Sequence, residues 1–480
     1  MIRLVLDHDL CSVQEARDLV RKAGKAQEEF AGYDGKKIDA ILQAMVKAVE
    51  ENAEKLARMA VEETKYGVLE HKAIKNLFAA RDVYNFIKDL PTTGIIKEDS
   101  KNKIIEAAVP MGVIVALTPT TNPTSTVIHN AMIALKAGNA VVFSPHPNAA
   151  GCSASAAEIL HQAAVKAGAP EGLIGCVTRP TLKATEELMQ HKDVAVIVAT
   201  GGSAMVKAAY SAGKPAFGVG PGNVPVFIER SADIKQAVKD IITSKTFDNG
   251  MICASEQAVI ADAPVKEQVI AEFKKQGAYF LNEKETEKVS TAIMKPGGAM
   301  NPAFIAKYAG LNIPADTKLL IAPLQGFGPD FPLSFEKLTT VLGFYTVKDW
   351  EEACNLSIEL LNLGGIGHTF AIHSRDEKII REFIRKPVFR IVVNTPSALG
   401  AIGYSTALTP SLTLGCGTWG GSSISDNLSP LHLINVKRLA FGIKPAEIPK
   451  PSQARSSSPC PVTDEDIADI VREVLKKLQA

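Results

Sequence analysis

Short apolar segments alternate with helix-length segments between residues 125 and 230, and this alternation constrains the fold more than any other feature. Helices are predicted at about 125–137, 153–167, 182–190 and 203–211, and strands at 140–143, 173–177, 194–199 and 224–228. Apolar strands separated by helices of about ten to fifteen residues indicate a parallel sheet covered on both faces. A second alternating series runs from 233 to about 420, so an α/β protein is expected.

Composition narrows the class of protein. The 480 residues exceed a single-core domain, and a net charge of +1 gives no electrostatic reason to expect nucleic acid or an anionic membrane as partner. The seven cysteines include no CxxC pair or Cys/His ligand spacing, so no metal site is expected. No run of about 18 apolar residues appears, and Asp7 and Asp9 argue against a secretory signal. A cytoplasmic protein is expected.

One cysteine, Cys253, lies in the polar loop 247–257, after a helical pattern (233–246) and before a strand-like run (257–261). A thiol at such a junction is polarised by nearby backbone N–H groups and can act as a nucleophile. A lone loop cysteine is more often inert, so its context must support the hypothesis.

Two strand ends suggest a nucleotide site. The strand 194–199 runs into Thr200, Gly201, Gly202 and Ser203 just before a helix, where glycines and free N–H groups can receive a diphosphate. This is not a GxGxxG motif, and a simple tight turn explains it equally well. A second turn, which begins at Ser144, leaves the sheet at the same edge and favours a cofactor there.

Several motifs, taken together, resemble the aldehyde dehydrogenase superfamily. They occur in the superfamily's order at 118–123, 143–145, 200–203 and 247–253. Three further segments resemble its CoA-acylating branch, which includes the aldehyde dehydrogenase half of bifunctional alcohol/aldehyde dehydrogenases and the propanediol- and ethanolamine-associated enzymes: 218–223, 365–369 and 412–421. The resemblance covers roughly residues 10–445.

The resemblance implies a domain arrangement with two Rossmann-like, doubly wound domains and a protruding β-hairpin. An NAD-binding domain would comprise 1–96 and 111–226, and a catalytic domain 227–424. The hairpin, 97–110 with about 425–444, would be an oligomerisation arm that builds a homodimer or homotetramer.

The resemblance also implies a reaction. The thiolate of Cys253 would attack a short-chain aldehyde such as acetaldehyde or propionaldehyde, hydride would pass to NAD, and coenzyme A would take the acyl group from the thioester. Asn122 would help to bind the oxyanion, although it is displaced by one position from the Asn of hydrolytic relatives. His368 would assist the CoA thiol, or serve only as a structural histidine.

The resemblance also implies which residues contact the cofactor. The choice of NAD over NADP is inferred only from the resemblance to the CoA-acylating branch. Glu336 would bind the nicotinamide ribose, with a solvated helix-start acid as the alternative. The full set of implied cofactor residues is Thr118, Pro119, Thr120, Thr121, Ser144, Thr200, Gly201, Gly202, Ser203, Gly220, Glu336 and Leu414.

The absence of one acidic residue distinguishes an acylating enzyme from a hydrolytic one. Hydrolytic relatives carry a glutamate upstream of the nucleophile that activates water, whereas the matching segment 217–223 contains no acid. A general base contributes about 10²–10⁴ in rate, so hydrolysis of the thioester is expected to be slow. A hydrolytic NAD(P)-dependent aldehyde dehydrogenase and a non-catalytic scaffold that retains the fold remain the alternatives.

The C-terminal region is different in kind. Residues 445–461 form a Pro/Ser-rich linker by composition, and 462–480 are predicted to form a short amphipathic helix that is marginal alone. The helix would pack on the enzyme's own body or in another protein's groove. Such tails resemble the encapsulation peptides that direct enzymes into bacterial microcompartments, with a shell protein as the partner. The apolar stripe is Ile467, Ile470, Val471, Val474, Leu475 and Leu478.

Overall fold

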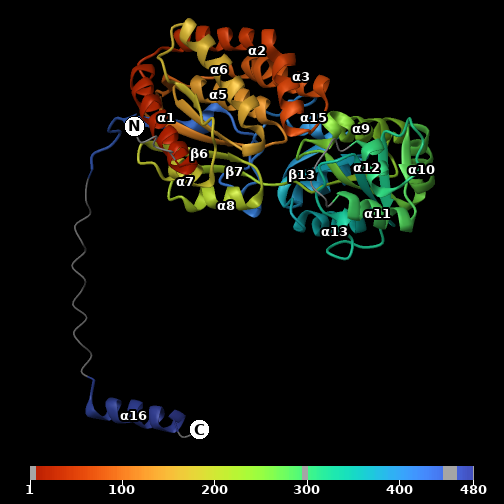
Figure 1. The fold of residues 1–480 in the computed structure, drawn as a ribbon. Coiled ribbons are helices and arrows are strands. Elements are labelled where there is room, and N and C mark those ends of the chain that lie inside the picture. The colour runs from red at the N-terminus through yellow and green to blue at the C-terminus, as the bar shows by residue number, and fades with distance from the viewer. Residues whose placement is uncertain (1–6, 294–300, 447–461, 479–480) are drawn as a thin grey trace. The chain divides into compact units, whose positions relative to one another are not determined.

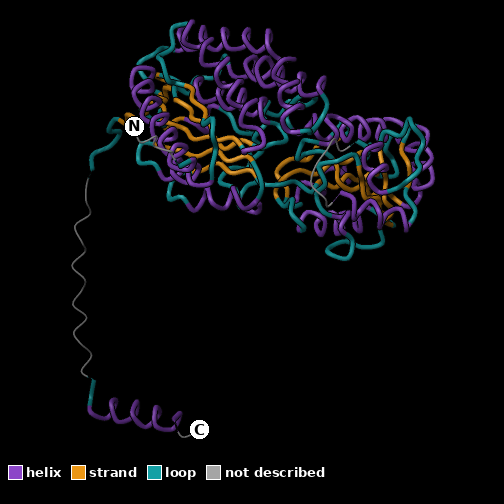
Figure 2. The backbone as a smooth tube through the Cα atoms, viewed as in Figure 1, coloured by secondary structure: helices purple, strands orange, loops and turns teal. Residues whose placement is uncertain are grey.

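The computed structural model describes residues 7–293, 301–446 and 462–478. The chain divides into two compact units, Met1–Ile96 with Glu106–Lys437, and Lys97–Ile105 with Arg438–Ala480. The first unit contains two parallel sheets, and Figure 2 shows their strands as central layers flanked by helices. The predicted α/β fold is therefore confirmed.

The first sheet has five strands in the order β5-β4-β3-β6-β7, with every neighbouring pair parallel. Its two central strands, β3 and β4, are buried along their whole length because helices cover both faces. The strands are β3 (Val113–Thr118), β4 (Ala140–Pro145), β5 (Ile174–Cys176), β6 (Val194–Thr200) and β7 (Ala216–Val219).

Helices cover this sheet on two sides (Figure 1). One layer is formed by α2 (Gly35–Thr64), α5 (Pro123–Lys136) and α6 (Ala150–Lys166), and the other by α1 (His8–Phe30), α7 (Leu182–Gln190) and α8 (Ser203–Ser211). Every residue of α5 is buried, so this helix lies in the core of the unit. After α2 the chain continues through α3 (Leu69–Leu77), a π-helical turn (Phe78–Asp82) and α4 (Val83–Ile87).

The second sheet has seven parallel strands in the order β10-β11-β12-β9-β8-β13-β14. These are β8 (Val224–Ile228), β9 (Glu256–Asp262), β10 (Ala278–Phe280), β11 (Leu319–Pro323), β12 (Val341–Val347), β13 (Gly367–His373) and β14 (Val388–Val393). Its helices are α9 (Ile234–Thr246), α10 (Lys266–Lys275), α11 (Glu283–Ile293), α12 (Pro302–Ala309), α13 (Trp350–Asn362), α14 (Glu377–Glu382) and α15 (Ser397–Ala401).

One strand belongs to a different sheet from the one expected. The sequence places 224–228 in the first alternating series, but β8 pairs with β9 and β13 in the second sheet. Strand patterns carry no information on which neighbours a strand pairs with, and the segment 220–223 leads the chain from one sheet to the other.

The predicted arm and tail also form regular structure. A third sheet has the order β1-β2-β15, with strands β1 (Gly94–Asp99), β2 (Ile104–Pro110) and β15 (Ile434–Ala440). Its role in oligomerisation stays a prediction. The tail helix is α16 (Asp464–Leu478), which buries none of its residues within its own unit. Most of the predicted linker, residues 447–461, lies outside the described residues.

Among the described residues, no helix is both long enough and apolar enough to cross a membrane. In the same ranges, no group of three or more His, Cys, Asp or Glu side chains is arranged to hold a metal ion.

A fully buried asparagine, Asn139, joins the start of the first sheet to the segment before β15. Its Oδ1 accepts hydrogen bonds from the N–H groups of Met111 (2.7 Å) and Gly112 (2.9 Å). Its Nδ2 donates to the carbonyl oxygen of Leu433 at 2.8 Å. One side chain thus satisfies three main-chain groups that no helix or strand satisfies.

Replacing this side chain should destabilise the protein. In Asn139→Ala, two N–H groups and one carbonyl lose their partner, and each unsatisfied buried group costs about 1–3 kcal/mol. We expect the free energy of unfolding to fall by about 3 kcal/mol or more, measured as a lower urea midpoint. Asn102→Ala, at an exposed turn, serves as the control and should change it by less than about 0.5 kcal/mol. Equal midpoints for the two variants would contradict this account.

Candidate active site

The carboxyl ends of three strands meet at one edge of the five-stranded sheet. Strands β4, β3 and β6 are adjacent and parallel, so the residues that follow them lie side by side. Ser144 lies near the end of β4, 118–121 at and beyond the end of β3, and 200–203 at the end of β6. The structure therefore brings these predicted cofactor residues to the place where doubly wound sheets bind ligands.

The edge has the properties that a diphosphate requires. Gly202 is the N-cap of α8, and no side chain caps the helix, so the N–H groups of its first turn remain available. A Cβ atom added at Gly202 would meet nothing within 4 Å, which leaves room for a ligand. The buried Oγ1 of Thr118 has no hydrogen-bond partner among the described residues. These residues fit a dinucleotide.

Backbone packs against backbone around Cys253. This residue follows the short 3-10 turn Phe247–Gly250 and precedes β9. A Cβ atom at Gly222 would overlap the carbonyl oxygen of Cys253 and would lie 3.2 Å from Cγ of His368. At Gly367 (φ 78°) it would overlap the carbonyl oxygen of Cys416. The three glycine-rich motifs predicted for the acylating branch therefore pack against one another, and the first of them packs against the main chain of Cys253.

His368 is fully buried, and its imidazole is in the neutral form. Its Nδ1 lies 2.9 Å from Oγ1 of Thr369, and its Nε2 has no partner within the described ranges. Burial, together with the nearby Arg390 guanidinium, lowers the pKa of His368 well below its usual value. The imidazole is therefore neutral at physiological pH, as a general base must be.

The surroundings of Cys253 favour the thiol form of its side chain. Burial raises the pKa of Cys253 to about 12, and the Glu336 carboxylate adds to the shift. The positive charge of Arg390 opposes both effects. Burial also raises the pKa of Glu336 to about 7, and its Oε1 accepts a hydrogen bond from the Gly222 N–H at 2.9 Å. The segment 217–223 has no acid of its own, but it is contacted by this carboxylate.

Two pockets adjoin the nucleophile loop and its neighbours. One, of about 760 Å³, is lined by residues that include Thr120, Thr121, Met251 and Glu336. The other, of about 520 Å³, is lined by residues that include Ser203, Gly220, Cys416 and Trp419. Leu414 lies beside Thr413, whose Oγ1 is 3.3 Å from that of Thr200. Five residues predicted to bind the cofactor thus line these two pockets: Thr120, Thr121, Ser203, Gly220 and Glu336.

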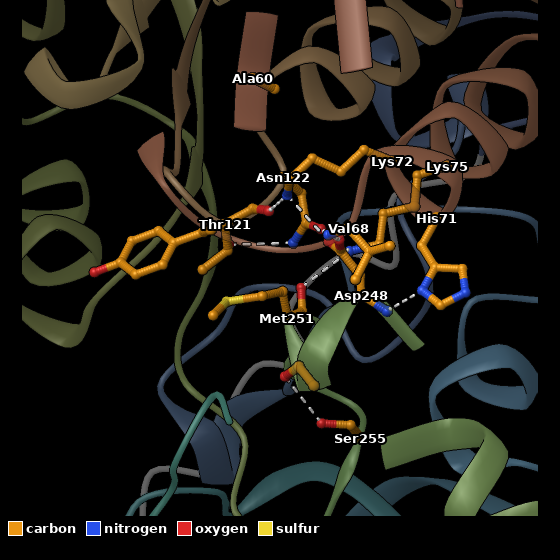
Figure 3. Close-up of polar contacts among 12 residues, drawn as sticks. Ala60, Val68, His71, Lys72, Lys75, Thr121, Asn122, Asp248, Met251 and Ser255 are labelled. Carbon is orange, nitrogen blue, oxygen red and sulfur yellow. Dashed lines mark hydrogen bonds and ion pairs between the residues drawn. The ribbon is translucent and has the colours of Figure 1, made fainter. Parts of the chain in front are cut away.

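Asn122 is held by a buried lysine (Figure 3). It is the N-cap residue of α5, yet its side chain does not cap the helix. Its Oδ1 instead accepts a hydrogen bond from Nζ of Lys75 at 2.6 Å, and its Nδ2 donates to Oγ1 of Thr121 at 3.1 Å. Lys75 also donates to the carbonyl oxygen of Met251, two residues before Cys253.

Comparison with known proteins identifies the family. The aldehyde dehydrogenase family profile matches residues 4–291. The chain is 40% identical over 441 residues to the acetylating succinate-semialdehyde dehydrogenase of Clostridium kluyveri, covering 90% of this chain and 97% of that protein. The chain belongs to the aldehyde dehydrogenase family.

Other relatives point to the acylating branch. The chain is 45% identical to the bifunctional aldehyde-alcohol dehydrogenase AdhE of Escherichia coli, a match that covers 89% of this chain and 50% of that protein. It therefore spans about half the length of such bifunctional relatives. The structure is similar, with a TM-score of 0.91 and 53% identity, to an acetylating aldehyde dehydrogenase from Geobacillus thermoglucosidasius, covering 93% of this chain and 100% of that one.

Several charged residues of this aldehyde dehydrogenase site were not found by sequence reasoning. Arg390 is buried on β14 and donates to the carbonyl oxygen of Gly415 at 2.6 Å. Lys72 and Lys75 lie on α3, and their side chains are 3% and 2% exposed. Lysines at helical spacing normally indicate a solvated face, so their sequence carries no signal. Asp248, the partner of both lysines, lies in the loop that contains Cys253. The sequence does not indicate which side chains this carboxylate contacts.

The carboxylate of Glu336 should restrain the reactivity of Cys253. Because this negative charge raises the pKa of the thiol, Glu336→Gln should lower it and speed alkylation by iodoacetamide. One pKa unit corresponds to a tenfold change in thiolate, so we expect a rate about tenfold above wild type at pH 8.5. At pH 6, below the pKa of about 7 for Glu336, the wild-type carboxyl is mostly neutral and the two rates should converge.

Alkylation at Cys253 would be measured by mass spectrometry on cofactor-free enzyme. Glu54→Gln, which removes an exposed acid from α2, provides the control and should match wild type at both pH values. A Glu336→Gln rate equal to or below wild type at pH 8.5 would refute the electrostatic role.

Proposed function

We propose that this chain oxidises a short-chain aldehyde, such as acetaldehyde or propionaldehyde, with NAD and CoA to give acyl-CoA and NADH. The observation that carries the proposal is the placement of Cys253 beside the neutral His368, across a Gly222 segment with no acid of its own. A propionaldehyde dehydrogenase of Rhodopseudomonas palustris, 30% identical with a TM-score of 0.78, is described with bound CoA and an acylated cysteine. That precedent supports a thioester on the nucleophile.

In the first half of the reaction, the Cys253 thiol would lose its proton to solvent and its sulfur would attack the aldehyde carbonyl, forming the C–S bond as the carbonyl π electrons move to oxygen. The positive charge of Arg390 favours the thiolate form. The resulting thiohemiacetal oxygen is negative, and the Nδ2 group of Asn122 together with N–H groups of the nucleophile loop would donate to it. NAD, when bound, supplies the acceptor for the hydride that leaves this carbon. The residues at 118–121 and 200–203 hold the dinucleotide, and Glu336 would bind its ribose.

The second half transfers the acyl group to CoA. The thiol of CoA attacks the thioester carbonyl, its proton passes to Nε2 of His368, and the Cys253 sulfur leaves as thiolate. Nε2 is suited to this step because the imidazole is neutral and the nitrogen has no partner in the described part of the chain. Water attack lacks a dedicated base in the segment 217–223. Glu336 lies near that segment, but its carboxylate accepts a hydrogen bond from the Gly222 N–H and, in this proposal, binds the cofactor ribose.

A placement in a bacterial microcompartment is also proposed, with α16 as the segment that binds a shell protein. The helix starts with three acids and ends with Lys476 and Lys477, and the six side chains of its apolar stripe are at least half exposed. A propionaldehyde dehydrogenase of the Clostridium phytofermentans fucose-utilisation microcompartment is 29% identical, with a TM-score of 0.80. We further propose that the β1-β2-β15 sheet takes part in a homodimer or homotetramer.

The reaction should require all three reactants. With acetaldehyde or propionaldehyde and NAD, NADH absorbance should rise only when CoA is present, and acyl-CoA should accumulate in equal amount. Cys253→Ala removes the nucleophile and should reduce the rate by ~10³ or more, whereas Cys11→Ala on α1 should not change it. NADH formation with carboxylic acid and without CoA would indicate the hydrolytic alternative. No NADH under any condition would indicate a scaffold.

Deletion of residues 446–480 should separate targeting from catalysis. Because the predicted site residues all lie before this segment, the truncated enzyme should retain full aldehyde oxidation and lose co-sedimentation with microcompartment shell protein. Leu475→Glu, which places a charge in the apolar stripe, is an internal control. It should weaken co-sedimentation and leave aldehyde oxidation unchanged. Equal co-sedimentation of truncated and full-length enzyme would reject the targeting role.

A further inference from the structure

Two buried lysines share one carboxylate next to the nucleophile loop (Figure 3). Nζ of Lys72 and Nζ of Lys75 lie 3.0 and 2.5 Å from Oδ2 of Asp248, and all three side chains are almost completely buried. Removing charges from water is costly, and here the second cation is not balanced by the shared acid. Neither lysine has a role in the reaction described above.

The two lysines make different contacts with their remaining hydrogens. Lys72 donates to the carbonyl oxygen of Thr121 at 2.9 Å. Lys75 donates to Oδ1 of Asn122 at 2.6 Å and to the carbonyl oxygen of Met251 at 3.2 Å. Only Lys75 therefore touches both the proposed oxyanion donor and the loop that carries Cys253.

The contact with Asn122 decides which end of its amide faces the site. An ammonium group has three donors and no acceptor, so it can bind only the amide oxygen. The oxygen is thereby held toward Lys75, and the Nδ2 group must point away from it. Nδ2 donates one hydrogen to Oγ1 of Thr121, and its other hydrogen is available to a ligand. A bound oxyanion requires this orientation, since only the nitrogen can donate.

The contacts with Asp248 and Met251 hold a strained part of the nucleophile loop. Asp248 and Asn249 have φ values of 52° and 54°, in the left-handed region that non-glycine residues rarely adopt. Such a conformation persists only when its surroundings enforce it. Oδ1 of Asp248 accepts from the Val68 N–H at 2.7 Å, while Lys75 binds the acid and the Met251 carbonyl, on either side of Asn249 and Gly250.

We infer that Lys75 is a positioning residue for the reaction: it orients the amide of Asn122 and fixes the Cys253 loop, so that one ammonium group sets the distance between nucleophile and oxyanion donor. The inference rests on the proposed function, whose reaction it deepens. The charge contributes as well. Burial lowers the pKa of Lys75 to about 8, and negative charge on Cys253 acts to raise it, so the ammonium in turn favours the thiolate.

Lys75→Met tests the inference against Lys72→Met, which removes an equal charge from the same carboxylate but leaves Asn122 and Met251 untouched. We expect kcat of Lys75→Met to fall at least about 100-fold with KM for NAD within about threefold, because the dinucleotide edge is unchanged. Lys72→Met should lose less than about tenfold. A Lys75→Met kcat within threefold of wild type, or equal losses in both variants, would overturn the positioning role.

A double-mutant cycle with Asn122→Ala tests whether Lys75 acts through the amide. If it does, the Lys75→Met/Asn122→Ala variant should be within about threefold of the slower single variant. Multiplication of the two losses would overturn the link. Should Lys75→Met fail to fold, Lys75→Arg keeps a charge and several donors but not the three-way ammonium geometry. The same cycle is then measured on it, with the same two outcomes.

A readout without turnover separates failure of this inference from failure of the proposed function. Iodoacetamide alkylation of Cys253 needs neither aldehyde, NAD nor CoA. At pH 7, Lys75→Met should slow it at least about tenfold relative to wild type, and Lys72→Met should slow it less. If wild type shows no CoA-dependent NADH formation, the proposed reaction fails while this difference still supports Lys75. Equal alkylation rates in wild type and both variants would reject the role of Lys75 at the nucleophile.

Discussion

Direct contact of main chain with main chain around Cys253 is the constraint on which the rest of the site depends. Gly222 and Gly367 lie where any side chain would overlap a neighbouring carbonyl oxygen. Segments from different parts of the chain can approach the main chain of Cys253 only because they lack side chains there. His368 belongs to one of these segments, whereas Arg390 and Glu336 come from other parts of the chain. The glycines of the motifs therefore allow the close packing that brings these side chains together.

Charged groups from three different parts of the chain act on Cys253. Glu336 precedes β12, and its negative charge opposes the thiolate of Cys253. Arg390 on β14 and Lys75 on α3 favour it. A ligand that draws the Glu336 carboxylate away from the Gly222 N–H would therefore shift this balance toward the thiolate. Under the proposed function, binding of the dinucleotide ribose by Glu336 would be one such event and would couple occupancy of the cofactor site to the protonation state of Cys253.

Local sequence patterns predicted the positions of helices and strands well, but they predicted poorly which strands pair. The helices at 182–190 and 203–211 have the predicted bounds because each begins at a turn and contains a regular apolar face. The strands of the first sheet were recognisable because they are buried on both faces. Strand 224–228 was assigned to the wrong sheet, since its neighbours β9 and β13 are distant in sequence. No local pattern contains that information.

The residues of the candidate site likewise fall into those that the sequence could indicate and those that it could not. Cys253, His368 and Glu336 could be named because their motifs resemble those of a known family. The cluster of Lys72, Lys75 and Asp248 could not, because its partners are separated by 173 to 176 residues and each looks ordinary in its own segment. The protonation of the thiol was also out of reach, since burial and the nearby charges of Glu336 and Arg390 determine it and both arise only on folding.

A nucleophile that rests in its protonated form also affects how long the protein survives. Peroxides oxidise cysteine through the thiolate, first to sulfenic acid and then irreversibly further. Cysteine enzymes with a permanently ionised thiol are exposed to this damage whether or not substrate is present. Here burial and the Glu336 carboxylate raise the pKa of Cys253, which favours the thiol over the thiolate. Idle enzyme should therefore tolerate oxidative stress and retain its capacity when aldehyde returns.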